Sequence, residues 1–552
     1  MNIDTKRQEE IKSLWEQFKS GITEADSTKL KKDVEHLLLQ WKSYRDKILD
    51  DSFTLDDYTN RIDITKAQMP GGYLCNFLER TTRILFGSSK PGNAHRFGIK
   101  LNSDGTTYTH RENLNIDHDK DYAIEIFNKD IKPLIKKIVN CENACNKGAI
   151  VENSKYAAKQ ILRKLSILDH QHDFIFIYSD DVIDALHKEF INSEESLNLN
   201  KNYEVRAHLN QLLNIKDTYE ENVLLSNFLW KYANTQSLAD QDSPNVILYG
   251  PPGTGKTYSV KNSLDFLCQG DRSRYEFVQF HPSFTYEDFI EGIKPKGVSV
   301  NGNIKFELVD GRFKRFCKKA KANPDKNYYF IVDEINRANL SSVFGETLMC
   351  LEKDYRHDGK SDDNLIKTQY SALIEDMIGS DESKNKSMAY HYSKDNDGEH
   401  HAYFGVPKNI FFIGMMNDVD KSIDAFDLAL RRRFKWIRKD CDYDVIDSEV
   451  KFRNGQDFNN IEKYRNACEK LNLFISEKLG MGKSYEFGHS FFMNISSISS
   501  TKTISQANMK KLFELYLQPT LKEYLRAMFP ENELDKNIDK ALDIFIAPLK
   551  KK

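Results

Sequence analysis

The sequence is poor in cysteine, with eight in 552 residues. So few thiols in so long a chain do not make a disulfide framework, and we expect a reducing, cytoplasmic environment. No apolar run approaches the ~20 residues that span a bilayer. The first residues, Met1–Arg7, lack the apolar core of a signal peptide. These absences argue against a secreted disulfide-stapled domain and predict a soluble protein without a membrane partner.

The chain also has little net charge, −3, so it is no polycation and any DNA contact must come from a local basic patch. No metal-dependent nuclease motif is recognisable, so we expect no nuclease site in this chain. The N-K-x-D guanine motif of small GTPases is absent too. The length predicts about three to four domains.

What the chain does have is a glycine-rich turn between a short apolar strand, residues 246–249, and a helix that can form over residues 258–268. Glycines let successive backbone N–H groups converge on phosphate oxygens, and the positive N-terminal end of the helix faces the same anion. Lys256 can reach the β- and γ-phosphates, and the Thr257 hydroxyl can bind Mg²⁺. The turn fits the phosphate-binding pattern G-x-x-x-x-G-K-[ST]. Its predicted nucleotide-binding residues are Gly250, Pro251, Pro252, Gly253, Thr254, Gly255, Lys256 and Thr257.

An acidic strand end later in the chain complements this turn. Residues 328–332 are apolar, and Asp333 and Glu334 follow them. Asp333 can hold Mg²⁺ through water, and Glu334 can orient and deprotonate an attacking water. Such a strand is weak evidence alone, but after a phosphate-binding loop it predicts the Walker B element of a nucleoside triphosphatase.

A third apolar strand, residues 409–416, ends in Asn417, which suits a sensor of the γ-phosphate. Arg431, Arg432 and Arg433 follow after a short helix. One of them can reach the γ-phosphate of a neighbouring subunit and stabilise the charge of the transition state. The alternative is a solvated or DNA-facing basic surface.

The first 235 residues carry no catalytic pattern. Apolar residues recur at helical spacing over residues 1–50, where we expect Trp15 and Trp41 in the core. The loop Ser88–Arg96 is either a DNA-contact loop or a surface turn. Residues 174–178 predict a short strand. The polar stretch 356–401 predicts a surface insertion in the nucleotide domain.

Together these motifs resemble the AAA+ superfamily and, in detail, the McrB family, the motor subunit of modification-dependent restriction systems. The resemblance is carried by residues 280–292, the Walker B extension 333–339, the segment Met416–Ser422 with the arginines after it, and the lid-like stretches 487–492 and 519–524. This chain has Asp418 and Lys421 where Thr and Arg are common.

The resemblance implies that Asn417 and Asp420 help to position the catalytic water. It also places the arginine finger just before an apolar residue, which favours Arg433, ahead of Phe434, and then Arg432. It implies a homo-oligomeric ring, expected as a hexamer, an McrC-like endonuclease partner, and DNA, possibly modified, as the target. The cofactors implied are Mg²⁺ and GTP or ATP.

We therefore expect a P-loop AAA+ αβα fold with a parallel sheet and a C-terminal helical lid, preceded by a mixed α/β region. The expected domains are residues 1–235 for target recognition, 236–440 for nucleotide binding and 441–552 for the lid. Two other functions remain open: a MoxR-like AAA+ remodeller of protein complexes, and a nucleotide-gated binding scaffold with little turnover.

Overall fold

The computed structural model describes residues 5–59, 73–86, 97–102, 105–155, 159–236, 238, 242–298, 302–359, 362–419 and 428–549. The chain divides into two compact units, Met1–Asn234 and Thr235–Lys552. Among these residues, no helix combines the length and the apolar character needed to cross a bilayer.

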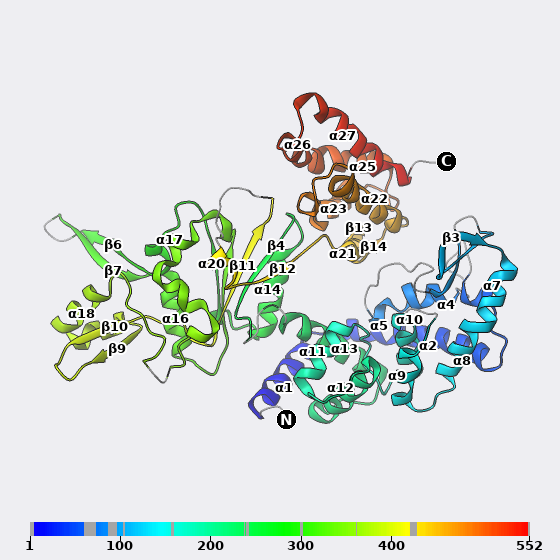
Figure 1. The fold of residues 1–552 in the computed structure, drawn as a ribbon, viewed down its shortest axis with the longest axis horizontal. Coiled ribbons are helices and arrows are strands. Elements are labelled where there is room, and N and C mark those ends of the chain that lie inside the picture. Colours follow the sequence, from blue (N-terminus) through cyan, green and yellow to red (C-terminus); the bar gives the residue numbers. More distant parts are fainter. Residues whose placement is uncertain are drawn as a thin grey trace. The chain divides into compact units, whose positions relative to one another are not determined.

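The first unit is mostly helical and carries one small antiparallel sheet with the strand order β1-β2-β3 (Figure 1). The strands are β1 (Ile99–Leu101), β2 (Tyr108–His110) and β3 (Asn113–His118). The helices are α1 (Thr5–Ser20), α2 (Glu24–Leu49), α3 (Leu55–Tyr58), α4 (Leu74–Asn76), α5 (Arg83–Phe86), α7 (Lys120–Ile126), α8 (Lys132–Val139), α9 (Ala144–Glu152), α10 (Lys159–Asp169), α11 (Asp180–Phe190), α12 (Asn198–Leu213) and α13 (Tyr219–Gln236).

The two tryptophans of the first helices are buried, as predicted. Trp41 on α2 belongs to the core of the unit, and Trp15 on α1 packs edge-on against Phe228 of α13 with ring centroids 5.4 Å apart. Helix α2 starts at a capping box, in which Thr23 and Asp26 each accept a hydrogen bond from the other's backbone N–H. Burial of these large side chains removes apolar surface from water and stabilises the unit.

The strand predicted over residues 174–178 is wrong. Residues 174–177 are buried but irregular, and side-chain amides and a hydroxyl satisfy their backbone groups in place of a neighbouring strand. Asn202 bonds to both backbone groups of Ile175, and the Ser226 hydroxyl accepts the N–H of Phe176. Buried backbone polar groups need partners of some kind, and here helices α12 and α13 supply them.

The second unit contains a five-stranded parallel sheet with the order β12-β4-β11-β8-β5 (Figure 1). In chain order the strands are β4 (Asn245–Gly250), β5 (Tyr275–Gln279), β8 (Tyr328–Asp333), β11 (Ile410–Asn417) and β12 (Lys435–Arg438). The chain passes from β4 to the edge strand β5 and returns through β8 and β11 to β12, so the connections that leave the adjacent strands β4 and β11 run in opposite directions. In open parallel sheets, ligands bind at the carboxyl ends of the strands where such a reversal occurs.

Two helices cover one face of this sheet through aromatic packing. Phe313 of α16 (Arg312–Lys321) stacks edge-on against Phe330 of β8 at 5.0 Å, and Phe344 of α17 (Leu340–Phe344) contacts Phe412 of β11 at 5.7 Å. The other helices of this domain are α14 (Lys256–Leu267), α15 (Tyr286–Phe289) and α20 (Leu428–Arg431). The sheet is thus a rigid base for the loops at its carboxyl edge.

A two-stranded hairpin, β6 (Glu291–Val298) and β7 (Ile304–Asp310), interrupts the chain between α15 and α16 and projects from the domain (Figure 1). Its outer part exposes the apolar side chains of Val298, Ile304 and Phe306. At its base the buried carboxylate of Glu291 bonds to Lys314 of α16 and to the Thr368 hydroxyl.

The polar insertion predicted over residues 356–401 has structure of its own, with α18 (Ser371–Ser380), α19 (Glu382–Asn385), β9 (His391–Lys394) and β10 (His400–Tyr403). The surface insertion predicted from residue 356 is wrong at its first two residues, because Arg356 and His357 are buried. The Arg356 guanidinium donates to the Leu351, Pro407 and Ile410 carbonyls and to Asn245 Oδ1, which closes the base of the insertion against β4 and β11. Burial lowers the pKa of Arg356 to about 10.

The C-terminal part of this unit is a helical bundle around a core of its own (Figure 1). It consists of α21 (Tyr443–Glu449), a short ladder of β13 (Lys451–Phe452) and β14 (Gln456–Asp457), and then α22 (Ile461–Leu473), α23 (His489–Met493), α24 (Ile495–Ile498), α25 (Gln506–Leu512), α26 (Gln518–Arg526) and α27 (Glu531–Ile546).

Candidate nucleotide-binding site

The predicted phosphate-binding loop joins β4 to the N-terminus of α14. Gly253 and Gly255 have φ angles of +77° and +70°, which favour glycine, and at Gly250 a Cβ would lie 2.2 Å from the Lys439 carbonyl oxygen. The Lys256 ammonium donates to the Gly250 and Pro251 carbonyls at 3.0 and 2.8 Å. The loop therefore presents its backbone N–H groups and a lysine together at a helix N-terminus, which is the donor set that a polyphosphate requires.

Thr257 and Asp333 meet across the carboxyl edge of the sheet. The Thr257 hydroxyl lies 3.3 Å from Asp333 Oδ2, although the two residues come from α14 and the end of β8. A hydroxyl and a carboxylate beside a phosphate site are oxygen ligands of the kind that Mg²⁺ takes, directly or through water. The residues present thus fit the cation that the sequence predicts.

Glu334 follows Asp333 with its backbone in the left-handed region, at φ 51°. Its carboxylate is partly buried, with 17% of the side chain exposed, and it accepts hydrogen bonds from two sides. The Arg337 Nε donates to Oε2 at 3.0 Å, and the Asn417 amide donates to Oε1 at 3.4 Å. A non-glycine residue in this conformation carries strain that tends to cluster at functional sites.

Asn417, at the end of β11, therefore lies beside the proposed general base, where the sequence places a γ-phosphate sensor. Its neighbour Asp418 accepts from Arg438 at 3.0 Å and from the Ser484 hydroxyl of the lid at 2.7 Å. The predicted water-positioning residue Asp420 and the predicted contact loop Ser88–Arg96 lie outside the described residues.

The structure separates the candidate finger residues. The Arg433 side chain is only 10% exposed and forms an ion pair with Glu352 at 2.8 Å, and its carbonyl accepts from the Asn245 side chain. The Arg432 side chain is 68% exposed and stands 3.5 Å from the same carboxylate. Arg431 lies over the ring of Trp436. The prediction ranks Arg433 first, but of the two arginines that face Glu352 its side chain is the less exposed.

Two residues to which the sequence interpretation assigned no role belong to this site. Arg337 is part of the Walker B extension and contacts Glu334, three residues before it. This spacing is the only feature of the sequence that indicates the contact. His489, in the lid stretch 487–492, lies with its Nε2 3.1 Å from the position that a Cβ on Gly255 would take. No local pattern indicates this approach, because it joins segments far apart in the chain.

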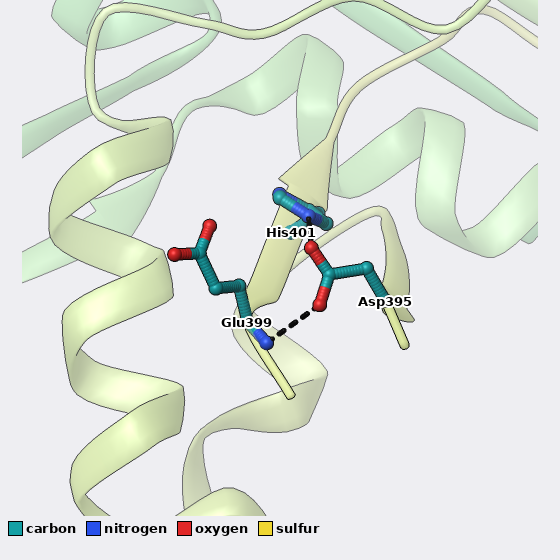
Figure 2. A group of neighbouring side chains, drawn as sticks. All are labelled: Asp395, Glu399 and His401. Carbon is teal, nitrogen blue, oxygen red and sulfur yellow. Dashed lines mark hydrogen bonds and ion pairs between the residues drawn. The ribbon is translucent and has the colours of Figure 1, made fainter. Parts of the chain in front are cut away.

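A separate group of possible metal ligands, Asp395, Glu399 and His401, lies at the β9–β10 hairpin (Figure 2). Asp395 Oδ1 accepts the backbone N–H groups of Asp397 and Glu399 at 3.0 and 2.8 Å, and Oδ2 lies 3.1 Å from His401 Nε2. These bonds cap the hairpin turn and account for the group without an ion.

Two protein families match the second unit, one over its nucleotide-binding domain and one over its helical lid. Residues 245–434 match the family described as AAA domain (dynein-related subfamily), and residues 463–527 match McrB, alpha-helical lid domain. The chain is 39% identical over 256 residues to the type IV methyl-directed restriction enzyme EcoKMcrB subunit of Escherichia coli K12, covering 45% of this chain and 47% of that protein. It is 24% identical over 254 residues to the type II restriction enzyme BsuMI component YdiS of Bacillus subtilis 168, covering 42% of this chain and 62% of that protein.

The chain thus spans about half of the length of the first of these relatives and less than two thirds of the second. A solved structure of a putative ATPase from Cytophaga hutchinsonii is 14% identical, with a match that covers 56% of this chain and 89% of that one, and its TM-score of 0.22 is too low to indicate a shared fold. The family matches and the parallel sheet confirm the expected αβα fold with a helical lid.

Proposed function

We propose that the protein is a McrB-type AAA+ NTPase and the ring-forming motor of a DNA restriction system, because residues 245–434 match the AAA domain family, residues 463–527 match the McrB lid family, and the chain is 39% identical over 256 residues to the Escherichia coli McrB subunit. In this proposal it hydrolyses GTP or ATP with Mg²⁺, binds DNA, and drives a partner endonuclease of the McrC type.

The observation that carries the proposal is the convergence of five side chains at the carboxyl edge of one sheet. Lys256 stands at the phosphate-binding loop, Thr257 pairs with Asp333, and Glu334 contacts Asn417. Lys256 would bind the β- and γ-phosphates, and Thr257 and Asp333 would hold Mg²⁺, which would neutralise charge on the phosphates. Glu334 takes the proton of the attacking water, and Asn417 orients the Glu334 carboxylate toward it.

Hydrolysis needs one further cation, because the transition state spreads charge over the γ-phosphoryl oxygens. The exposed Arg432 supplies it to the site of a neighbouring subunit, so that turnover requires the homo-oligomeric ring, which we expect to be a hexamer. Arg433 supports this arrangement from within its own subunit through its ion pair with Glu352.

The restriction role draws on the relatives, both of which carry the words restriction enzyme in their names. The first unit, Met1–Asn234, is the proposed DNA-recognition part. It has a hydrophobic core of its own and is thereby built as an independent module.

The test is phosphate release by the purified full chain with GTP or ATP and Mg²⁺, alone, with DNA, and with DNA and an McrC-type endonuclease. We expect hydrolysis that EDTA abolishes and that the partner increases, together with DNA cleavage only when all components are present. Lys256→Ala is the control for adventitious hydrolysis. Hydrolysis without any cleavage, stimulated by a protein target and indifferent to DNA, would replace this proposal with the remodelling function.

A further inference from the structure

The lid contacts the phosphate-binding loop directly, through backbone hydrogen bonds. The N–H of Gly488 donates to the Pro252 carbonyl at 3.1 Å, and the N–H of Ser490 donates to the Gly253 carbonyl at 3.0 Å. The contact is so close that a Cβ on Gly488 would lie 2.1 Å from the Gly253 backbone. The two segments can approach this closely only because glycine stands at both positions. A movement of the lid here must therefore break these hydrogen bonds or move the loop.

His489 lies between these two hydrogen bonds and turns its ring toward Gly255, the residue before Lys256. Its Nε2 is 3.1 Å from the position of a Cβ on Gly255. On the other side of the ring, Nδ1 accepts the backbone N–H of Asp442 at 3.3 Å. An acceptor role for Nδ1 places the proton on Nε2, so the ring presents an N–H donor at the rim of the loop.

The surroundings keep this ring neutral. Burial lowers the pKa of His489, and the nearby Asp442 only partly opposes this effect. Within the described part of the chain, no residue accepts a hydrogen bond from Nε2. A neutral donor held in place beside a phosphate cradle is ready to bind an anion without the cost of burying another charge.

We propose that His489 is a nucleotide ligand from the lid, whose Nε2–H donates a hydrogen bond to the polyphosphate held by the loop. This inference rests on the proposed nucleotide-binding function and assigns a contact within it. Because the same lid segment is bonded to Pro252 and Gly253, the contact ties the position of the lid to the occupancy of the phosphate site.

A matched pair of substitutions separates this role from packing. His489→Asn keeps an oxygen near the position of Nδ1 for the Asp442 N–H but has no group at the position of Nε2. His489→Gln extends its amide to the position of Nε2 and gives up the bond to Asp442. The measurement is the dissociation constant of the full chain for GTP, ATP and their diphosphates with Mg²⁺, by calorimetry, together with the midpoint of thermal unfolding without nucleotide.

We expect His489→Asn to bind nucleotide about tenfold more weakly, as for the loss of one hydrogen bond to a charged group, and His489→Gln to stay within about threefold of wild type. The loss should be the same for guanine and adenine nucleotides, because the contact is to phosphate. The inference is overturned if His489→Asn binds like wild type, if the loss depends on the base, or if both variants lose affinity in step with a lower unfolding midpoint.

Lys256→Ala distinguishes this inference from the proposed function beneath it. If wild type binds nucleotide no better than Lys256→Ala does, the proposed function itself is wrong. If wild type binds, Lys256→Ala does not, and His489→Asn equals wild type, only the role of His489 is wrong.

Discussion

Arg337 holds the carboxylate of Glu334 through a hydrogen bond of 3.0 Å from Nε to Oε2, three residues along the same short turn. Asn417 approaches the other oxygen from the neighbouring strand at 3.4 Å. With φ of Glu334 at +51°, the backbone turns this side chain out of the direction of its strand. The carboxylate proposed to activate water is thus oriented by a cation, an amide and the backbone together.

Glu334→Gln should separate nucleotide binding from hydrolysis. Gln keeps the shape of the side chain but cannot take a proton from water, so we expect hydrolysis at least about a hundredfold slower with nucleotide affinity close to that of wild type. Phosphate release and calorimetric binding measure the two effects. Lys256→Ala is the contrasting variant, since it should weaken binding itself. Normal turnover by Glu334→Gln would show that another group is the base.

Arg337→Ala should slow hydrolysis by about tenfold without a change in nucleotide affinity, because a mispositioned base costs rate and not ground-state binding. Arg337→Lys keeps the charge without the Nε donor and should recover little. A matched control is Arg526→Ala, which removes an exposed arginine from an i,i+3 pair with Glu523 on α26. If both Ala variants hydrolyse at the wild-type rate, Arg337 does not position Glu334.

The sequence predicts those parts of the site whose residues lie close together in the chain. The turn from Gly250 to Thr257 and the acids after residue 332 are each contained in one strand–loop segment, and the structure has strands and a helix at those places. Asn417 was assigned from its place at a strand end, and parallel pairing of β11 with β8 brings it near Glu334.

The contacts that escaped prediction join segments far apart in the chain. His489 reaches Gly255 from the lid, and Arg356 binds the carbonyl of Ile410 and the side chain of Asn245. The sequence offers no spacing for either pair. The strand predicted at residues 174–178 fails for the same reason. The apolar run correctly predicts burial, but the backbone hydrogen bonds of this segment go to Asn202 and Ser226, which are distant in the chain.

Arg432→Ala and Arg433→Ala should fail in different ways. Arg433 is mostly covered and is the nearer of the two arginines that face Glu352, so its removal should lower the unfolding midpoint by weakening that ion pair. Arg432 is exposed, so its removal should leave the midpoint unchanged and abolish hydrolysis in the assembled ring. Thermal unfolding and phosphate release on both variants decide between the two arginines.

Mixing tests whether Arg432 acts across subunits. Arg432→Ala subunits keep an intact phosphate-binding loop, and Lys256→Ala subunits keep an intact finger, so neither should hydrolyse well alone. Mixed rings should regain activity at interfaces that join the two intact halves. If mixtures regain nothing while both variants assemble, the action in trans is wrong.

Arg356→Met should destabilise the nucleotide domain. It leaves the carbonyls of Leu351 and Ile410 and the side chain of Asn245 without their buried donor. Losses of this kind amount to about 3 kcal/mol or more, which corresponds to a drop of about 5–10 °C in the midpoint for a domain of this size. The control is the exposed Lys408→Met, at the point where the insertion rejoins the sheet. Equal midpoints for the two variants would contradict the anchoring role.

DNA binding should depend on the first unit and should weaken as salt rises. Phosphate contacts release counterions from DNA, so the logarithm of the affinity falls linearly with the logarithm of the salt concentration, by about one unit of slope for each contact. We expect the full chain to bind duplex DNA at ~50 mM salt and to lose the binding steeply by ~200 mM. The double variant Lys90→Ala, Arg96→Ala, in the loop predicted to contact DNA, should bind more weakly with a shallower slope, whereas Lys29→Ala on the exposed side of α2 should equal wild type. Fluorescence anisotropy over a salt series measures both quantities.

Two results would contradict this prediction. If the folded full chain binds no DNA at the lowest salt, the first unit does not recognise DNA. If the double variant has the wild-type slope, the loop is a surface turn and does not contact DNA.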